Sequence, residues 1–266
     1  MSISFSTEIS SLLIMLLTLT FSSCTDNTGA ANVLEPISIP PATVLDVYID
    51  ATPSVNKVGR SEVAENLFKS LPALVKNRNI IELRIFEFGR DGFAPIERMS
   101  INFPSIEGFL KQEMPRDIEK RLFREAAIEA KRREKALQEY KEKVQEVLKG
   151  FSAQTFLPIN STEPYTDIKG LVYRISSIKD SRPHLILVIT DGNGSHLDEI
   201  QPPPPPQSPV QLVIVITPER SETSGSLEDY ARKRTLLTKI VPWAQIIPFF
   251  IEDFNTVFED AKTQNK

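Results

Sequence analysis

The chain has 266 residues, with 31 Lys and Arg against 35 Asp and Glu, a net charge of −4 and a single Cys. An apolar fraction of 41% and a charged fraction of 25% are typical of globular proteins, which excludes a wholly disordered chain and a polytopic membrane protein. The acidic balance argues against a dedicated nucleic-acid-binding protein, which usually carries a basic excess. One Cys excludes an intramolecular disulfide and a zinc site made of several thiolates.

The single Cys follows an apolar run near the N-terminus. Residues 12–21 are apolar over about ten positions, whereas a membrane-spanning helix needs about 20. Small residues, Ser22 and Ser23, directly precede Cys24, as they do at a signal cleavage site. This arrangement resembles the signal of a bacterial lipoprotein, in which the Cys is acylated and becomes the first residue of the mature protein.

The resemblance implies that residues 1–23 are a lipoprotein-type signal peptide and that Cys24 is the lipidation site. It places the mature protein in the cell envelope, anchored in a membrane through its lipid and facing the extracytoplasmic side. The alternatives are an ordinary signal peptide, or a leader in which the Cys is incidental. Residues 24–43 are small and polar and then rich in Pro, which predicts a flexible tether before a folded domain over 44–266.

Apolar strands alternate with amphipathic helices from residue 44 onward. The strands at 80–88 and 94–103, with a Gly-rich turn between them, predict an antiparallel hairpin, and the other apolar runs are typical of strands buried on both faces. The pattern therefore predicts an α/β fold of Rossmann-like type, a doubly wound, mainly parallel sheet with one antiparallel edge strand. The expected strands cover 44–50, 80–88, 94–103, 184–191, 210–217 and 244–250, and shorter helices cover 56–76, 167–179, 227–240 and 254–261.

Two further segments are unusual. Residues 115–149 predict one elongated helix of about 50 Å, since neither Gly nor Pro interrupts them after Pro115. Such a helix packs through a single apolar stripe with its other faces in solvent, or associates with a partner or a second copy. The proline-rich loop at 201–209 either spaces two strands or presents a polyproline ligand to a partner.

Oxygen-bearing side chains gather where the strands end. Asp50 and Asp191 close two apolar strands, Thr52 and Ser54 follow the first of them, and Thr166 precedes a helix. Ligands of doubly wound sheets bind beyond the carboxyl ends of the strands, so we expect these side chains to meet there. Oxygen ligands with little negative charge suit a hard cation such as Mg²⁺.

This set resembles the metal-ion-dependent adhesion site of the von Willebrand factor A (VWA) family, which has the pattern Asp-x-Ser-x-Ser, a distant Thr and a later Asp. Asp50, Thr52, Ser54, Thr166 and Asp191 match it in order, with Thr52 where the family has Ser. The resemblance implies that a divalent cation, Mg²⁺ or Mn²⁺, is bound directly by the hydroxyls of Ser54 and Thr166. It also implies an open coordination position for an acidic side chain of a protein partner. The expected function is that of a binding module and not of an enzyme.

Three alternatives compete with this interpretation. In the first, Asp50, Thr166 and Asp191 merely cap helices, as short polar side chains often do. In the second, the chain is a phosphohydrolase of the haloacid-dehalogenase type with Asp50 as nucleophile, although Thr52 stands where that family needs a second Asp. In the third, the long helix acts as a scaffold and the metal site is vestigial.

Overall fold

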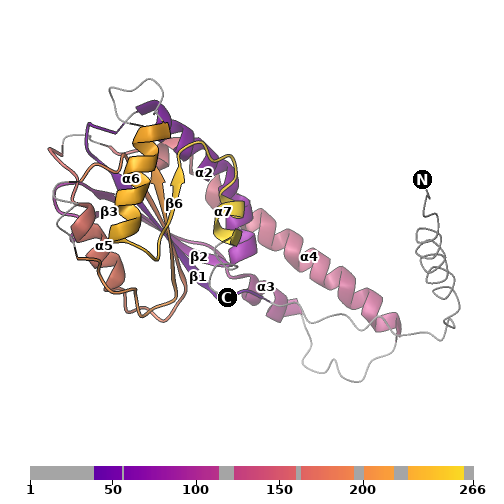
Figure 1. The fold of residues 1–266 in the computed structure, drawn as a ribbon. Coiled ribbons are helices and arrows are strands. Elements are labelled where there is room, and N and C mark those ends of the chain that lie inside the picture. The colour runs from indigo at the N-terminus through magenta and orange to yellow at the C-terminus, as the bar shows by residue number, and fades with distance from the viewer. Residues whose placement is uncertain are drawn as a thin grey trace, which may run out of the picture.

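The computed structural model describes residues 39–55, 57–113, 123–159, 163–194, 201–218 and 227–260. Its centre is a six-stranded sheet in the order β3-β2-β1-β4-β5-β6, in which β3 runs antiparallel to β2 and the other pairs are parallel (Figure 1). The predicted doubly wound sheet with one antiparallel edge strand is confirmed. The strands are β1 (Thr43–Asp50), β2 (Ile80–Phe88), β3 (Ile96–Asn102), β4 (His184–Thr190), β5 (Val210–Ile216) and β6 (Gln245–Pro248).

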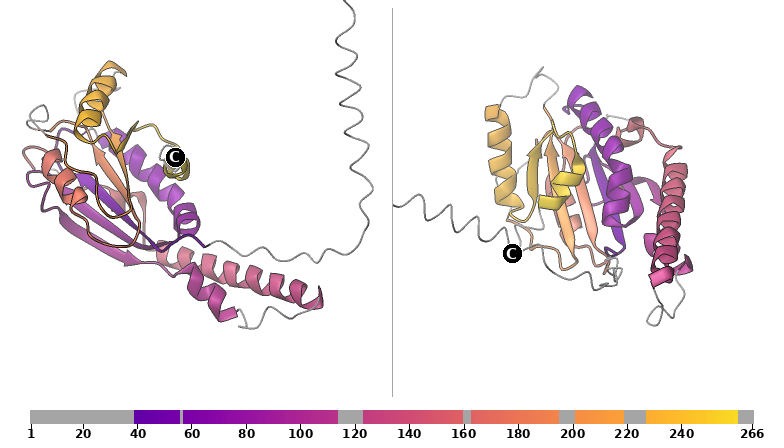
Figure 2. Two further views of the ribbon diagram at one scale, coloured as in Figure 1. Left: turned by 60° about the horizontal axis from the view of Figure 1, so that its bottom comes forward. Right: turned by 90° about the vertical axis from the view of Figure 1, so that its right-hand side faces the viewer.

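Helices cover both faces of the sheet (Figures 1 and 2). One face packs against α2 and α7, with α3, α4 and the 3-10 helix η2 extending the same core, and the other packs against α5 and α6. The helices are α2 (Lys57–Arg78), α3 (Ile106–Glu113), α4 (Phe123–Leu148), η2 (Ala153–Phe156), α5 (Ile168–Ser176), α6 (Leu227–Ile240) and α7 (Phe254–Asp260).

Strand β1 is one of the two central strands, and all eight of its residues are buried. It pairs in parallel with β2 on one side and with β4 on the other. Because successive side chains of a strand point to opposite faces, Leu45, Val47 and Ile49 enter the α2 core while Tyr48 enters the α5 core. Asp50 ends this strand at its carboxyl edge, so its position is set by packing on both faces.

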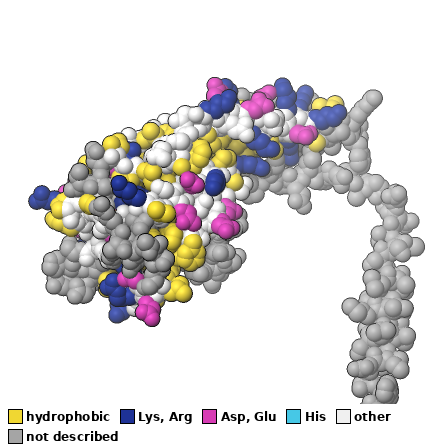
Figure 3. Space-filling view, turned by 90° about the horizontal axis from the view of Figure 1, so that it is seen from above, with side chains coloured by type: hydrophobic (Ala, Val, Ile, Leu, Met, Phe, Trp, Pro, Cys, Tyr) yellow, Lys and Arg dark blue, Asp and Glu magenta, His cyan; other side chains and the backbone are white. Residues whose placement is uncertain are grey.

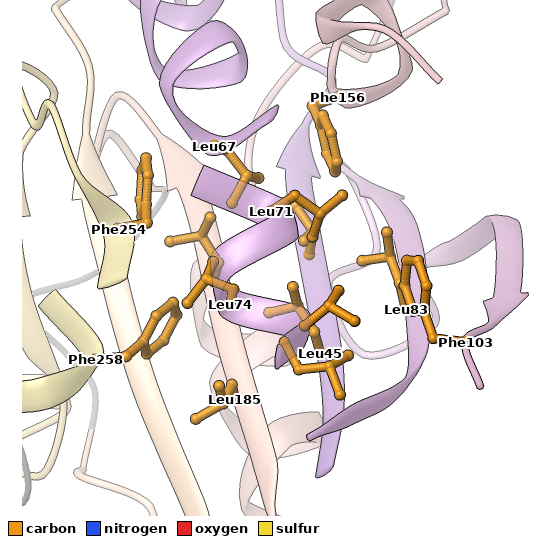
Figure 4. Packing of buried hydrophobic residues seen from close by; sticks show 14 of the residues in the cluster. Leu45, Leu67, Leu71, Leu74, Leu83, Phe103, Phe156, Leu185, Phe254 and Phe258 are labelled. Carbon is orange, nitrogen blue, oxygen red and sulfur yellow. The ribbon is translucent and has the colours of Figure 1, made fainter. Parts of the chain in front are cut away.

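Helix α2 lies across the sheet and fixes the start of the loop that follows β1. Leu67, Leu71 and Leu74 are completely buried, and they belong to the same hydrophobic cluster as Phe254 and Phe258 of α7 (Figure 4). Burying each such Leu side chain contributes about 1.5–3 kcal/mol. This packing holds the N-terminal turn of α2 close to the carboxyl ends of β1 and β4.

A charged group is also buried in the middle of the sheet. Asp46 of β1 has no exposed surface, and its carboxylate accepts hydrogen bonds from Arg84 Nε at 2.6 Å and Arg84 Nη2 at 2.9 Å. His184 Nδ1 lies 2.8 Å from the second carboxylate oxygen. The two partners come from β2 and β4, so one buried carboxylate ties three neighbouring strands together.

The boundary between tether and domain lies earlier than the sequence predicts. Thr43 already belongs to β1, Ile39 packs against the core, and the Pro40 carbonyl accepts a hydrogen bond from Asn79 Nδ2 at 2.9 Å. Residues 39–43, which we assigned to the tether, are therefore part of the domain. Residues 1–38, with Cys24 and the predicted signal peptide, lie outside the described residues.

Helix α4 projects beyond the sheet, and acidic and basic side chains both line its surface (Figures 1 and 3). Its buried stripe includes Ala136, Tyr140, Val144 and Leu148, which agrees with the expected packing through a single face. The Tyr140 ring meets the Phe109 ring of α3 edge-on at 5.8 Å. The helix predicted over 115–149 is confirmed at 123–148, and residues 114–122 lie outside the described ranges.

Of two segments that connect the main elements, one contains a short helix and the other is irregular. The segment between α4 and α5 contains the 3-10 helix η2, whose Phe156 is fully buried in the α2 core. The proline-rich residues 201–209 contain neither helix nor strand and lead directly into β5, as predicted. No helix in the described part of the chain is both long and apolar enough to span a bilayer.

We predict that Asp46→Ala lowers the free energy of unfolding by about 3 kcal/mol, because it leaves Arg84 and the buried His184 without their shared carboxylate. Urea denaturation at neutral pH measures this loss. Glu65→Ala is the control, since the Glu65–Lys69 pair on α2 is exposed, and it should change stability by less than about 0.5 kcal/mol. Equal losses of stability in the two variants would contradict the conclusion that the buried Asp46 carboxylate ties the three strands together.

Candidate metal centre

The predicted site residues lie at the carboxyl edge of the sheet, where the strand order reverses between β1 and β4. Such a switch point is the usual ligand-binding crevice of doubly wound folds. Asp50 ends β1, Thr52 and Ser54 lie in the loop between β1 and α2, and Thr166 precedes α5. Asp191 follows directly after β4.

Four of the five predicted residues contact one another through their side-chain oxygens. Thr52 Oγ1 lies 2.7 Å from Asp50 Oδ1, 3.0 Å from Ser54 Oγ and 3.1 Å from Thr166 Oγ1. Thr166 Oγ1 in turn donates to Asp50 Oδ2 at 3.0 Å. Asp50, Thr52 and Thr166 are buried, whereas Ser54 is exposed, so the cluster opens to solvent at Ser54.

The fifth residue, Asp191, lies beside this cluster but does not share its hydrogen bonds. Its Oδ1 accepts a hydrogen bond from the Asn193 backbone N–H at 2.9 Å. Its Oδ2 is buried and meets no hydrogen-bond donor among the described residues. A buried carboxylate oxygen is costly unless a donor, a water molecule or a cation compensates it. This oxygen therefore has the capacity to accept a further interaction at the edge of the cluster.

Asp167 holds Thr166 in place. Its Oδ1 accepts from the Gly170 N–H at 2.8 Å, which makes it the N-cap of α5, and its Oδ2 accepts from the Gly92 N–H at 3.0 Å. Its own N–H donates to the Gly89 carbonyl at 2.7 Å. The alternative in which Thr166 is the helix cap is wrong, because Asp167 takes that role and leaves the Thr166 hydroxyl to Asp50.

Thr190 belongs to the site although the sequence did not single it out. Its Oγ1 donates to Asp50 Oδ2 at 2.7 Å and accepts from the Gly192 N–H at 3.1 Å. Gly192 has a φ of +74°, a conformation that turns the chain just after Asp191 and favours glycine. The strand register would have revealed Thr190, since Ile49 pairs with Ile189 and the next positions, 50 and 190, are therefore adjacent.

Arg60 is the second residue that the sequence interpretation missed. It is the fourth residue of α2 and only 4% exposed, and its Nη2 donates to the Thr52 carbonyl at 3.1 Å. One sequence signal existed, because Arg60 shares the apolar stripe of Val63 and Leu67 at helical spacing. A charged residue on a buried stripe needs a buried partner, and here the carboxylates lie close by.

The two carboxylates are electrostatically coupled. Burial and the negative charge of Asp191 raise the pKa of Asp50 to about 6, although hydrogen bonds from Thr52 and Thr190 act in the opposite direction. Burial lowers the pKa of Arg60, while Asp50, Asp191 and Glu87 oppose that shift. The site therefore holds two buried acids and one buried base before any ion binds.

This donor set fits a hard divalent cation. A Mg²⁺ ion prefers six oxygen ligands at about 2.0–2.1 Å, which places adjacent ligands roughly 3 Å apart. The separations of 3.0 and 3.1 Å from Thr52 Oγ1 to the hydroxyls of Ser54 and Thr166 are similar to that spacing. Within the described ranges, no group of three or more His, Cys, Asp or Glu could hold a metal, so cation binding here would depend on the hydroxyls.

Comparisons with known proteins give only remote matches. No protein-family model and no curated protein matches the chain. An aerotolerance-related membrane protein from Bacteroides fragilis aligns at 11% identity and a TM-score of 0.38, covering 84% of this chain and 98% of that one. Proximal thread matrix protein 1 from the mussel byssus aligns at 10% identity and a TM-score of 0.36, covering 85% of this chain and 47% of that one. The fold assignment rests on the sheet topology described above.

Without metal, we expect the Asp50 carboxyl to reduce stability as the pH rises from about 4 to about 6. The folded-state pKa of about 6 exceeds the ordinary 3.8, so the folded protein binds the extra proton in this range and loses that advantage as the proton leaves. Urea denaturation in EDTA across pH 4–8 measures the effect as the difference between the wild type and Asp50→Asn. As the pH rises, Asp50→Asn should become more stable relative to the wild type. If the wild type instead gains stability relative to Asp50→Asn, the raised pKa assigned to Asp50 is contradicted.

Proposed function

We propose that the chain is a binding module that holds Mg²⁺ or Mn²⁺ at this site and uses it to engage an acidic side chain of a protein partner. The observation that carries the proposal is the cluster around Asp50, in which the hydroxyls of Thr52 and Thr166 contact its carboxylate and the Ser54 hydroxyl contacts that of Thr52. Beside it lies Asp191 Oδ2, which meets no donor among the described residues. In this proposal Ser54 and Thr166 bind the cation directly. Asp50, Thr52 and Asp191 contribute oxygens directly or through water.

The chemistry of the ligands explains how a partner would be recognised. When bound, the cation would supply a positive charge that attracts a carboxylate. The proposed direct ligands are hydroxyls, which carry no negative charge and so would not themselves offset the charge of the cation. Because Ser54 is exposed while Asp50, Thr52 and Thr166 are buried, a partner can approach from the Ser54 side.

A hollow beside the site offers further contact area for the same partner. It has a volume of about 590 Å³, and its lining includes Ala51, which lies between Asp50 and Thr52, together with Gly89 and Glu87. Ile96 and Tyr165 line it as well and are 69% and 45% exposed. Exposed apolar side chains around a polar site are typical of surfaces that bind proteins.

The geometry favours binding over phosphoryl transfer. Asp50 is completely buried, and both of its carboxylate oxygens accept hydrogen bonds from hydroxyl groups. A nucleophilic carboxylate needs access to its substrate and a nearby acid or base, and Thr52 supplies only a hydroxyl at the position where a second Asp would be required.

We expect saturating Mg²⁺ to raise the melting temperature at pH 7.5 relative to EDTA. A concentration of 100 Kd adds about 2.7 kcal/mol of stability, which corresponds to about 5–10 °C for a domain of this size. Asp50→Ala and Thr166→Val should abolish the shift, since each removes an oxygen of the cluster. The control Thr238→Val removes a hydroxyl from the exposed face of α6 and should keep the shift. An unchanged response in Asp50→Ala would refute the metal site.

The membrane anchor is a separate part of the proposal and rests on the sequence around Cys24. Full-length protein produced in a bacterial host should be found in the membrane fraction, require detergent for release and incorporate labelled palmitate. Cys24→Ser removes the only thiol of the chain and should abolish labelling. Wild-type protein that carries no label would refute the anchor without affecting the metal site.

A further inference from the structure

We propose that Arg60 is the resident counter-ion of the Asp50–Asp191 pair and that its charge weakens the binding of a divalent cation. The inference rests on the proposed function for its second half, because it concerns how tightly the same site holds its cation. Its first half, the counter-ion role, concerns the protein without metal.

Arg60 is fixed next to the loop after β1 that carries Thr52 and Ser54, called the ligand loop below. Its Nη2 donates to the carbonyl of Thr52, whose hydroxyl contacts Asp50, Ser54 and Thr166. The preceding residue, Gly59, packs so closely on Pro218 that a Cβ there would lie 2.7 Å from the proline Cδ. The first turn of α2 is therefore confined from one side by this contact and from the other by the core, and the 4% exposed side chain has little freedom to leave.

The charges of the site balance differently with and without a cation. Asp50 and Asp191 contribute −2 and Arg60 contributes +1, so the metal-free site has a net charge of −2 + 1 = −1. A divalent cation changes this sum to −1 + 2 = +1. Without Arg60, the two carboxylates alone would neutralise the same cation. Like charges repel strongly in a buried region, so Arg60 opposes the entry of the cation.

Arg98 and Lys233 each form an ion pair with an acid other than Asp50 and Asp191. Arg98 Nη1 lies 2.9 Å from Glu87 Oε1, and Lys233 Nζ lies 2.7 Å from Asp229 Oδ2. Arg60 is the base that donates to the ligand loop itself. The same positive charge that weakens cation binding would also leave the loaded site net positive, which favours an acidic partner. Cation affinity is thus reduced in exchange for attraction to the partner.

Titration calorimetry with MgCl₂ at pH 7.5 tests the metal half of the proposal. Arg60→Gln keeps a hydrogen-bond donor but removes the charge, and it should bind Mg²⁺ at least tenfold more tightly than the wild type. Arg60→Lys keeps the charge and should stay within about threefold of the wild type. Arg78→Gln is the matched control, a buried arginine at the opposite end of α2, and should not change the affinity. Equal or weaker binding by Arg60→Gln overturns the proposal while leaving the metal site intact.

Denaturation in EDTA tests the counter-ion half independently of metal. Arg60→Gln should lower stability, and adding Asp50→Asn should restore most of the loss because one uncompensated carboxylate is then removed. Absence of that rescue overturns the counter-ion role. If neither the wild type nor Arg60→Gln binds Mg²⁺ or Mn²⁺, the proposed function fails, and the rescue experiment still decides the role of Arg60.

The same experiments also decide the outcome if Arg60→Gln does not fold. Should Arg60→Gln be unfolded in EDTA, recovery of the folded state on adding Mg²⁺ would support the proposal. Should it stay unfolded with Mg²⁺, Arg60→Lys decides, since a change of more than tenfold in affinity with the charge retained would overturn the electrostatic explanation.

Discussion

A carboxylate with no exposed surface must be compensated from within the protein, and Asp50 is compensated from three segments of the chain. Hydroxyls reach it from the loop after β1, from the residue before α5 and from the end of β4. Each of these segments is held in place by a different contact. The core beneath α2 holds the loop after β1, the Asp167 cap holds the residue before α5, and the register with β1 holds the end of β4. The arrangement of the whole carboxyl edge of the sheet thus follows from the burial of one charge.

Two buried acids in the same strand illustrate how the partners of a carboxylate determine its role. Asp46 and Asp50 both lie on the α5 side of β1, four residues apart. Asp46 is surrounded by Arg84 and His184 and has no need of a further cation. Asp50 accepts hydrogen bonds from hydroxyls, which satisfy its lone pairs but bring no positive charge into direct contact with it. The first is suited to holding strands together and the second to attracting an ion.

Sequence reasoning predicted the parts of the fold that depend on local pattern. The apolar runs of β1, β4 and β5 predicted strands buried on both faces, and the turn between β2 and β3 predicted the antiparallel edge. Sequence reasoning also predicted where the candidate site lies, because the carboxyl ends of parallel strands meet at one edge of the sheet regardless of which side chains they carry. The early start of the domain at Ile39 depends on contacts with the distant Asn79 and the core, which no local pattern reveals.

The residues that were missed depend on tertiary geometry in the same way. Thr190 enters the site only because β4 pairs with β1 in one particular register. Arg60 follows from the placement of the N-terminal turn of α2 against the ligand loop, which depends on the whole core beneath that helix. The competition between Thr166 and Asp167 for the cap of α5 could not be resolved from their order alone, since either residue type makes a good N-cap.

The double role of Asp167 has a mechanical consequence. One carboxylate holds the first turn of α5 through Gly170 and the turn between β2 and β3 through Gly92, and it adjoins Thr166 in the chain. A displacement of Thr166 is therefore expected to move the helix and the hairpin turn with it, because three hydrogen bonds of Asp167 join them. The antiparallel edge of the sheet is in this sense rigidly joined to the site.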